Sequence, residues 1–156
     1  MTKLLLSLHV IVAIVAVGPV TVAASVFPRT AREAAAAPGD PGPLAALRTL
    51  HRICRVYALL AMLVPALGLA TAGAMGVLGD VWLTTSIFLT GVAGFVLAGF
   101  VLPLQERILR ELDAPAAASA IPATAARLAM TVGLFNLLWA SVTVLMIVRP
   151  GSTTGA

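Results

Sequence analysis

The stretch VWLTTSIFLTGVAGFVLAGFVLPL, residues 81–104, contains no Asp, Glu, Lys or Arg along its whole length. Three further stretches share this property, at residues 4–27, 56–79 and 128–148. Even the shortest has about 21 residues, which at 1.5 Å per residue span about 31 Å and match a hydrocarbon core about 30 Å thick. None alternates polar with apolar residues, so helices, not barrel strands, are expected to satisfy the backbone in lipid. The sequence predicts an all-α fold, an antiparallel bundle of four transmembrane helices.

The composition excludes a soluble globular protein. Hydrophobic residues make up 60% of the 156 residues and charged residues 10%, whereas soluble domains average about 25% charged residues. A single cysteine rules out an intramolecular disulfide, a CxxC redox pair and a thiolate metal cage. The net charge of +4 comes from basic residues strung between apolar stretches, so no continuous patch for nucleic acid is expected. The lipid bilayer is the predicted partner, and we expect no nucleic acid, cofactor or metal.

The basic residues predict the orientation of the bundle. Cytoplasmic loops retain Lys and Arg, and the first and third connections hold all of the basic residues except Lys3 and Arg149. We therefore expect a multi-pass protein of a bacterial inner membrane with both termini outside. Residues 1–149 are predicted to form one transmembrane domain and residues 150–156 a disordered tail. The arginines of the two connections are Arg29, Arg32, Arg48, Arg52, Arg55, Arg107, Arg110 and Arg127.

The segments around the first stretch allow a second interpretation. Lys3, an apolar run and the small residues at 22–25 resemble a secretory signal peptide, although the arginines that follow argue against export of the next segment.

The Pro/Gly cluster at 38–43 predicts a turn, flanked by helical composition at 31–37 and 44–55. Residues 105–112 predict a short charged helix with a solvated face, and the Ala/Pro-rich residues 113–126 a flexible linker.

Small residues predict how the helices approach one another, because helices in lipid gain no hydrophobic drive from meeting and rely on close contact. Two stripes at spacing four are expected to bring the second and third helices into backbone contact. They consist of Gly68, Ala72 and Gly76 in the second stretch, and Thr90, Gly94 and Ala98 in the third. Pro65 predicts a bend or a freed carbonyl at about Ala61, and Pro19 a similar distortion in the first helix.

His9 is the only ionisable side chain inside a predicted span, and such residues are functional candidates. Antiparallel helices place it at the same outer level as several hydroxyls and one carboxylate. The candidate site is a small, polar, outward-opening cavity formed by His9, Asp80, Thr84, Thr85 and Ser141. Two alternatives stay open: His9 is a neutral imidazole bonded to a neighbouring helix, or Asp80 is a turn residue whose carboxylate caps the third helix.

A haem site would also depend on His9. His51, the other histidine, is expected at the opposite membrane surface, on the order of 30 Å away along the helix axis. The two therefore cannot ligate one iron within one subunit. A haem held by His9 with another axial ligand stays an alternative, although Met62 and Met130 lie in the other halves of their spans.

Three further polar features lie outside the candidate cavity. Asn136 lies near the bilayer centre, where an unpartnered amide is costly, so it is expected to bond another helix. Glu106 and Arg110 form a favourable helix pair at spacing four. Cys54 is expected to be a lone structural thiol, with palmitoylation or activation by neighbouring arginines as alternatives.

The motifs that the sequence lacks bear on its function. No Asp or Glu lies within a span, and the chain has no phosphate loop, HExxH or GxSxG. We therefore expect no enzyme, but a non-catalytic accessory or assembly subunit that binds a membrane protein partner or forms a homo-oligomer. A small-solute transporter or channel and a haem-binding redox protein are the alternatives.

Several segments together resemble a family of predicted four-helix integral membrane proteins from bacteria, catalogued as domain of unknown function 2269. The segments are LSLHVIVAIVAVGPV at 6–20, RVYALLAMLVPALGLA at 55–70 and the run from residue 79 to residue 109. The most specific parts are VPALG at 64–68, DVWL at 80–83 and LPLQERIL at 102–109. The resemblance covers residues 4–148 and implies a fold and no reaction.

Overall fold

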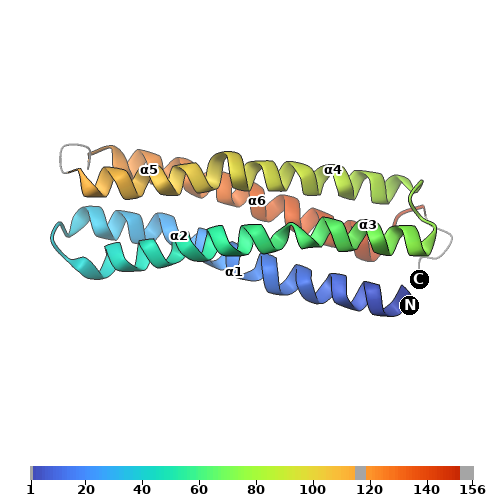
Figure 1. Cartoon of the computed structure of the whole chain (residues 1–156). Helices are drawn as coiled ribbons and strands as arrows, with labels where there is room; N and C mark the ends of the chain where they lie inside the picture. Colours follow the sequence, from blue (N-terminus) through green and yellow to red (C-terminus); the bar gives the residue numbers. More distant parts are fainter. Residues whose placement is uncertain (1, 115–118, 152–156) are drawn as a thin grey trace.

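The computed structural model describes residues 2–114 and 119–151. Over these residues the chain forms α1 (Thr2–Ala36), α2 (Pro41–Ala61), α3 (Leu63–Met75), α4 (Val81–Val96), the π-helical turn η1 (Leu97–Val101), α5 (Leu102–Asp113) and α6 (Ile121–Val148). α2 continues into α3, and α4 continues through η1 into α5, so the elements form four antiparallel rods (Figure 1). Each rod is long and apolar enough to cross a membrane. The predicted all-α bundle of four transmembrane helices is confirmed.

The rods are longer than the apolar stretches that define them. α1 has 35 residues, about 52 Å at 1.5 Å per residue, against a hydrocarbon core of about 30 Å. The helical composition predicted on both sides of the Pro/Gly cluster is confirmed, since only residues 37–40 separate α1 from α2. Asp40 caps α2, because its Oδ1 accepts the amide of Gly42 at 2.9 Å. Both helices therefore extend beyond the uncharged stretches at this end.

The predicted linker at 113–126 is partly wrong. α6 begins at Ile121 with a proline in its first turn, a position where the missing N–H costs nothing. Residues 115–118 of the linker and residues 152–156 of the predicted tail lie outside the described residues. The remaining connection between α5 and α6 is therefore shorter than the composition indicated.

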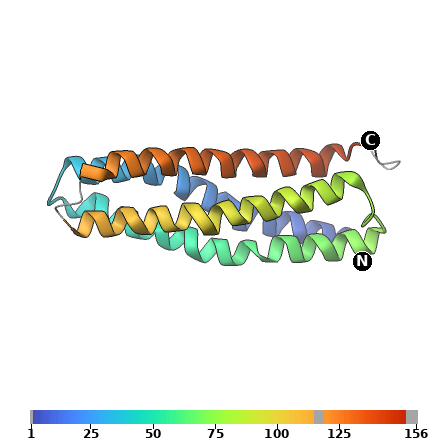
Figure 2. The same ribbon diagram turned by 90° about the horizontal axis from the view of Figure 1, so that it is seen from above.

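Both termini lie at one end of the bundle, and the first and third connections lie at the other (Figures 1 and 2). The latter end, which we call the arginine-rich end, collects the arginines of residues 29–55 and 107–127. Lys3 and Arg149 lie at the end that carries the termini. The antiparallel order thus separates the basic residues as the sequence predicted.

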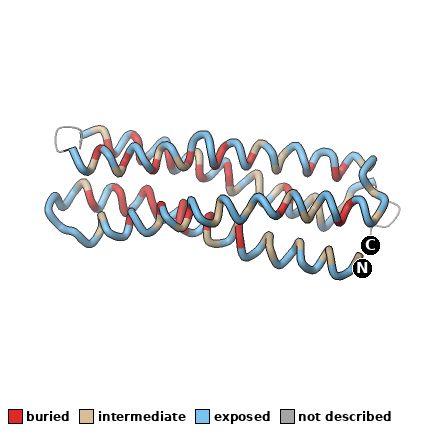
Figure 3. Tube along the Cα trace, in the orientation of Figure 1, coloured by how far each residue is buried: buried red, intermediate tan, exposed pale blue. Residues whose placement is uncertain are grey.

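The packed core lies in the half of the bundle nearer the arginine-rich end. Its largest fully buried side chains are Phe27, Leu47, Ile108 and Phe135, one from each rod. In contrast, residues 2–15 of α1 contain no buried residue, and the exposed colour dominates that segment in Figure 3. Large apolar side chains such as Val81, which is 80% exposed, cover the outside of the rods, as expected where lipid is the solvent. The larger core thus lies near the arginine-rich end, and a smaller cluster of Ala72, Trp82 and Leu83 packs near the end that carries the termini.

Proline has different effects in the first two rods. α2 ends at Ala61, and the Met62 amide reaches back only three residues, to the Leu59 carbonyl. Pro65 has no N–H for the Ala61 carbonyl, so the predicted distortion at Ala61 is confirmed. α1, however, runs through Pro19 as one helix.

The predicted contact between the two small-residue stripes is wrong. α3 packs against α1, and α4 packs against α6. A Cβ at Gly68 would meet His9, whereas one at Gly94 would meet no atom within 4 Å. Ala98 is exposed, and Gly76 ends α3 with φ 71°. Ala72 does reach the start of α4, where it is buried with Trp82 and Leu83.

Candidate functional site

His9 lies against α3 in the half of the bundle that carries the termini. The position that a Cβ would take on Gly68 is 3.0 Å from His9 Cε1, so the imidazole fits there because residue 68 is glycine. His9 borders a small cavity of about 40 Å³ that is also lined by Thr71, Trp82 and Met146. Its Nδ1 is buried and has no hydrogen-bond partner among the described residues. The bond predicted for an interhelical imidazole is therefore not made at Nδ1.

The other residues of the predicted polar cavity do not line this cavity. Thr84, Thr85 and Ser141 each donate a hydrogen bond to the carbonyl four residues earlier in their own helix, at 3.2, 2.8 and 2.9 Å. Such bonds satisfy a hydroxyl locally. The structure thus places the predicted hydroxyls on helix surfaces and does not assemble the predicted cluster around one cavity.

Asp80 occupies the N-cap position of α4, as the turn interpretation predicted, but its carboxylate makes no cap hydrogen bond. Instead, Asp80 Oδ2 accepts the indole N–H of Trp82 at 2.8 Å. The Arg149 guanidinium lies 5.5 Å from the centre of the same indole ring, which is within the range of a cation–π contact. Asp80 therefore positions Trp82, and Trp82 joins the start of α4 to the end of α6.

A second polar group, which the sequence did not reveal, is buried at the arginine-rich end. His51 Nδ1 donates to Gln105 Oε1 at 3.0 Å, and Gln105 Nε2 donates to Cys54 Sγ at 3.4 Å. Gln105 and Cys54 are fully buried, and His51 is 9% exposed. We call these three residues the polar junction. It ties α2 to α5, and His51 Nε2 lies 3.7 Å from Glu106 Oε1 at its rim.

A neighbouring group ties α5 to α6. Glu111 is buried, and its Oε1 accepts from Arg107 Nε at 2.7 Å. The hydroxyl of Thr124 lies 3.3 Å from Glu111 Oε2. A more exposed contact joins α2 to α5, where the Arg48 guanidinium lies 3.2 Å from the Asp113 carboxylate. Buried polar groups are stable when their hydrogen bonds are satisfied, so these contacts fix the register of the rods.

The solvated face predicted for residues 105–112 is thus wrong for two of its members. Gln105 and Glu111 are buried, while Glu106, Arg107 and Arg110 are exposed. The predicted Glu106–Arg110 pair is present, with a long separation of 3.9 Å. No sequence signal predicted this burial, because glutamine and glutamate side chains also suit a charged surface helix.

The predictions for Asn136 and Cys54 are confirmed. Asn136 Nδ2 donates to Ser25 Oγ of α1 at 3.2 Å, which is a bond between helices. Cys54 is a free, fully buried thiol. Burial leaves no room for the alternative of a lipid-modified cysteine in this fold.

Within the described ranges, no group of three or more His, Cys, Asp or Glu side chains is arranged to hold a metal ion. His9 lies against Gly68 of α3, and His51 bonds Gln105 of α5, so the two histidines belong to separate surroundings. No protein-family model, curated protein or solved structure matches the chain.

Proposed function

We propose that this chain is a non-catalytic accessory or assembly subunit of a bacterial inner membrane, and that it belongs with the four-helix membrane proteins that it resembles. The observation that supports a partner is the outer face of α4 and the start of η1, formed by Gly91, Gly94 and Ala98. All three residues are exposed, and a Cβ built at either glycine meets nothing within 4 Å. We call this surface the small face.

The small face suits contact with a transmembrane helix of another protein. Small residues let helix backbones approach closely in lipid, where such packing is the main source of attraction. Phe88 and Phe95, which are 69% and 65% exposed, stand beside the small residues and add ridges for a partner helix. The bundle itself does not use this face, because α4 packs against α6 through its buried side.

The polar side chains support a non-catalytic role. His51, Gln105 and Cys54 bond one another in the interior, and Glu111 bonds Arg107 and Thr124. Groups that could carry chemistry thus join helices to one another. A subunit of this kind acts by presenting a rigid surface to its partner.

Purification from native membranes tests the proposal. We expect the tagged chain to carry one transmembrane partner at a fixed ratio, and Gly94→Leu to remove that partner. Gly133→Leu is the matched control, since Gly133 is exposed on α6 with nothing within 4 Å of a Cβ. A monomer, a self-oligomer, or equal partner loss in both variants contradicts the proposal.

We also propose that the arginine-rich end faces the cytoplasm, which the positive-inside rule supports. Single cysteines at Ala37 and Pro150, placed in a Cys54→Ala background, report the two ends. A membrane-impermeant maleimide is expected to label Pro150→Cys on intact cells and Ala37→Cys only after permeabilisation. The reverse pattern refutes this orientation.

A further inference from the structure

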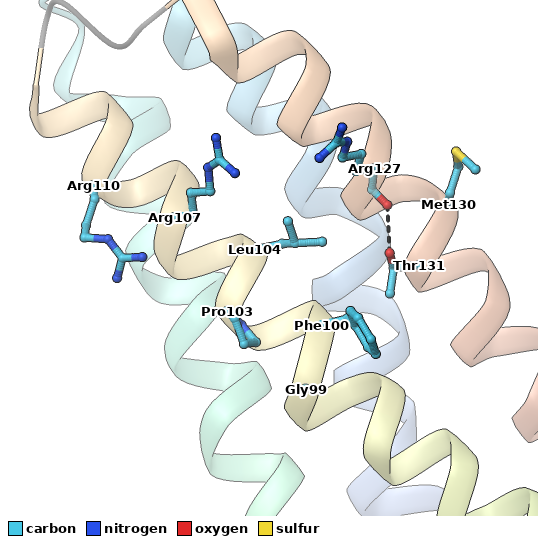
Figure 4. Close-up of a pocket in the computed structure, with 9 residues that line it drawn as sticks. All are labelled: Gly99, Phe100, Pro103, Leu104, Arg107, Arg110, Arg127, Met130 and Thr131. Atoms are coloured by element: carbon cyan, nitrogen blue, oxygen red, sulfur yellow. Dashed lines mark hydrogen bonds between the residues drawn. The ribbon is translucent and has the colours of Figure 1, made fainter.

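A groove of about 550 Å³ lies between η1 and α5 on one side and α6 on the other (Figure 4). One part of its lining is apolar and the other is basic. The apolar residues include Phe100, Leu104 and Met130, and the basic residues are Arg107, Arg110 and Arg127. Met130 is 77% exposed and Phe100 48% exposed, so the groove is open on the side that faces lipid.

The groove straddles the boundary between the apolar stretches and the arginine-rich end. The uncharged run of the third rod ends at Leu104, and that of the fourth begins immediately after Arg127. Arg107 and Arg110 lie about one and two helical turns beyond Leu104. The arginines therefore lie at headgroup level, and the apolar part extends toward the membrane interior.

The charges of the basic part are not balanced. Arg107 pairs with Glu111 at 2.7 Å, and the contact of Arg110 with Glu106 is long, at 3.9 Å. Over residues 2–114 and 119–151, no acidic side chain lies within 4.0 Å of the Arg127 guanidinium. In Figure 4 the guanidinium groups of Arg107 and Arg127 point toward one another across the groove. An anion between them would contact both guanidinium groups and balance the charge of Arg127.

The wall of the groove follows from a local break in helix geometry. Pro103 has no N–H to donate to the carbonyl of Gly99, and in a regular helix its ring would clash with that carbonyl. The preceding turn widens to a π-helix, in which the Leu102 amide donates to the Leu97 carbonyl, five residues back. Gly99, within this turn, adds no side chain to the lining.

We propose that this groove binds an anionic phospholipid, with its phosphate between Arg107 and Arg127 and an acyl chain along Phe100 and Met130. Basic pockets between transmembrane helices at headgroup level are suited to such lipids, and arginine binds phosphate oxygens in a fork geometry. The proposal goes beyond the accessory role, because it concerns lipid and a different surface from the small face. It holds for either orientation, since both leaflets have headgroups.

Native mass spectrometry of the full-length, delipidated protein tests the proposal with phosphatidylglycerol and phosphatidylcholine at equal concentration. The wild type is expected to retain phosphatidylglycerol preferentially. Arg127→Gln should weaken its binding about fivefold, the factor expected for one basic residue near an anionic headgroup. Arg110→Gln tests the α5 side of the groove independently and should also weaken phosphatidylglycerol binding. Thr131→Phe should reduce binding by filling the groove.

Arg52→Gln is the matched control, since Arg52 is an exposed arginine at the same end of the bundle that does not line the groove. We expect it to bind phosphatidylglycerol as the wild type does. Equal retention of both lipids, or equal losses in Arg52→Gln and Arg127→Gln, overturns the proposal. So does displacement of the lipid by millimolar inorganic phosphate, because the site would then recognise a free anion.

Discussion

Replacement of Gln105 by leucine tests whether the polar junction holds α2 against α5. Gln105 is fully buried and is bonded to His51 at 3.0 Å and to Cys54 at 3.4 Å. Leucine keeps the volume but leaves the His51 Nδ1 hydrogen without an acceptor. A buried polar group that loses its partner costs about 1–3 kcal/mol. Loss of the Gln105–Cys54 contact adds little to this cost, because the thiol sulfur is a weak acceptor.

The double variant His51→Leu, Gln105→Leu separates this bond from a general packing effect. When both partners become apolar, neither leaves an unsatisfied group, and the change can be nearly neutral. We therefore expect each single variant to lose about 1–3 kcal/mol of unfolding free energy and the double variant to lose less than their sum. The difference, about 1–2 kcal/mol, is the coupling energy of the pair.

Unfolding in mixed micelles, followed by far-ultraviolet circular dichroism at increasing denaturing detergent, measures these free energies. Glu106→Gln is the control, because the contacts of this half-exposed carboxylate with His51 and Arg110 are long, at 3.7 and 3.9 Å. It should change stability by less than about 1 kcal/mol. Strictly additive losses in the double variant, or an unchanged Gln105→Leu protein, would refute the reasoning.

Three further predictions concern contacts and a break within the membrane-spanning helices. Gly68→Ala is expected to destabilise by about 1–3 kcal/mol through overpacking against His9, and His9→Ala should rescue it in the same unfolding assay; equal costs in both backgrounds would contradict this contact. Asn136→Ala and Ser25→Ala should show a coupling of about 0.6 kcal/mol, typical of a hydrogen bond between membrane helices, and a double-mutant cycle that returns zero would exclude the bond. Pro65→Ala should join α2 to α3 and slow amide hydrogen exchange at residues 62–66, whereas unchanged exchange would assign the break to another cause.

The number of helices and their approximate positions could be predicted from the sequence. A stretch such as residues 81–104 has no water to bond its backbone in lipid, so it forms a helix whatever its neighbours are. Pro65 also acts locally, through its missing N–H, and the end of α2 at Ala61 followed from it. Asn136 needed a partner because of its depth, although the sequence did not identify Ser25.

The candidate site could not be predicted in this way. His9 was singled out correctly as the ionisable residue of a span, but its neighbour is Gly68 and not the hydroxyls at the same depth. Hydroxyls on a helix can bond their own backbone, so equal depth did not bring Thr84 or Ser141 to His9. Gln105 looked like part of a charged surface helix, and its burial depends on α2 lying opposite.

The sequence by itself determined four membrane-length helices, the position of the first turn and the end at which the arginines gather, because each depends on local composition and on the thickness of a bilayer. Only the tertiary structure decided which faces meet: α3 on α1, α4 on α6, and Gln105 against His51. The physical reason is that lipid and protein interior are similarly apolar. An uncharged helix therefore carries no strong amphipathic signal for its rotation, and shape and hydrogen bonding between rods settle it.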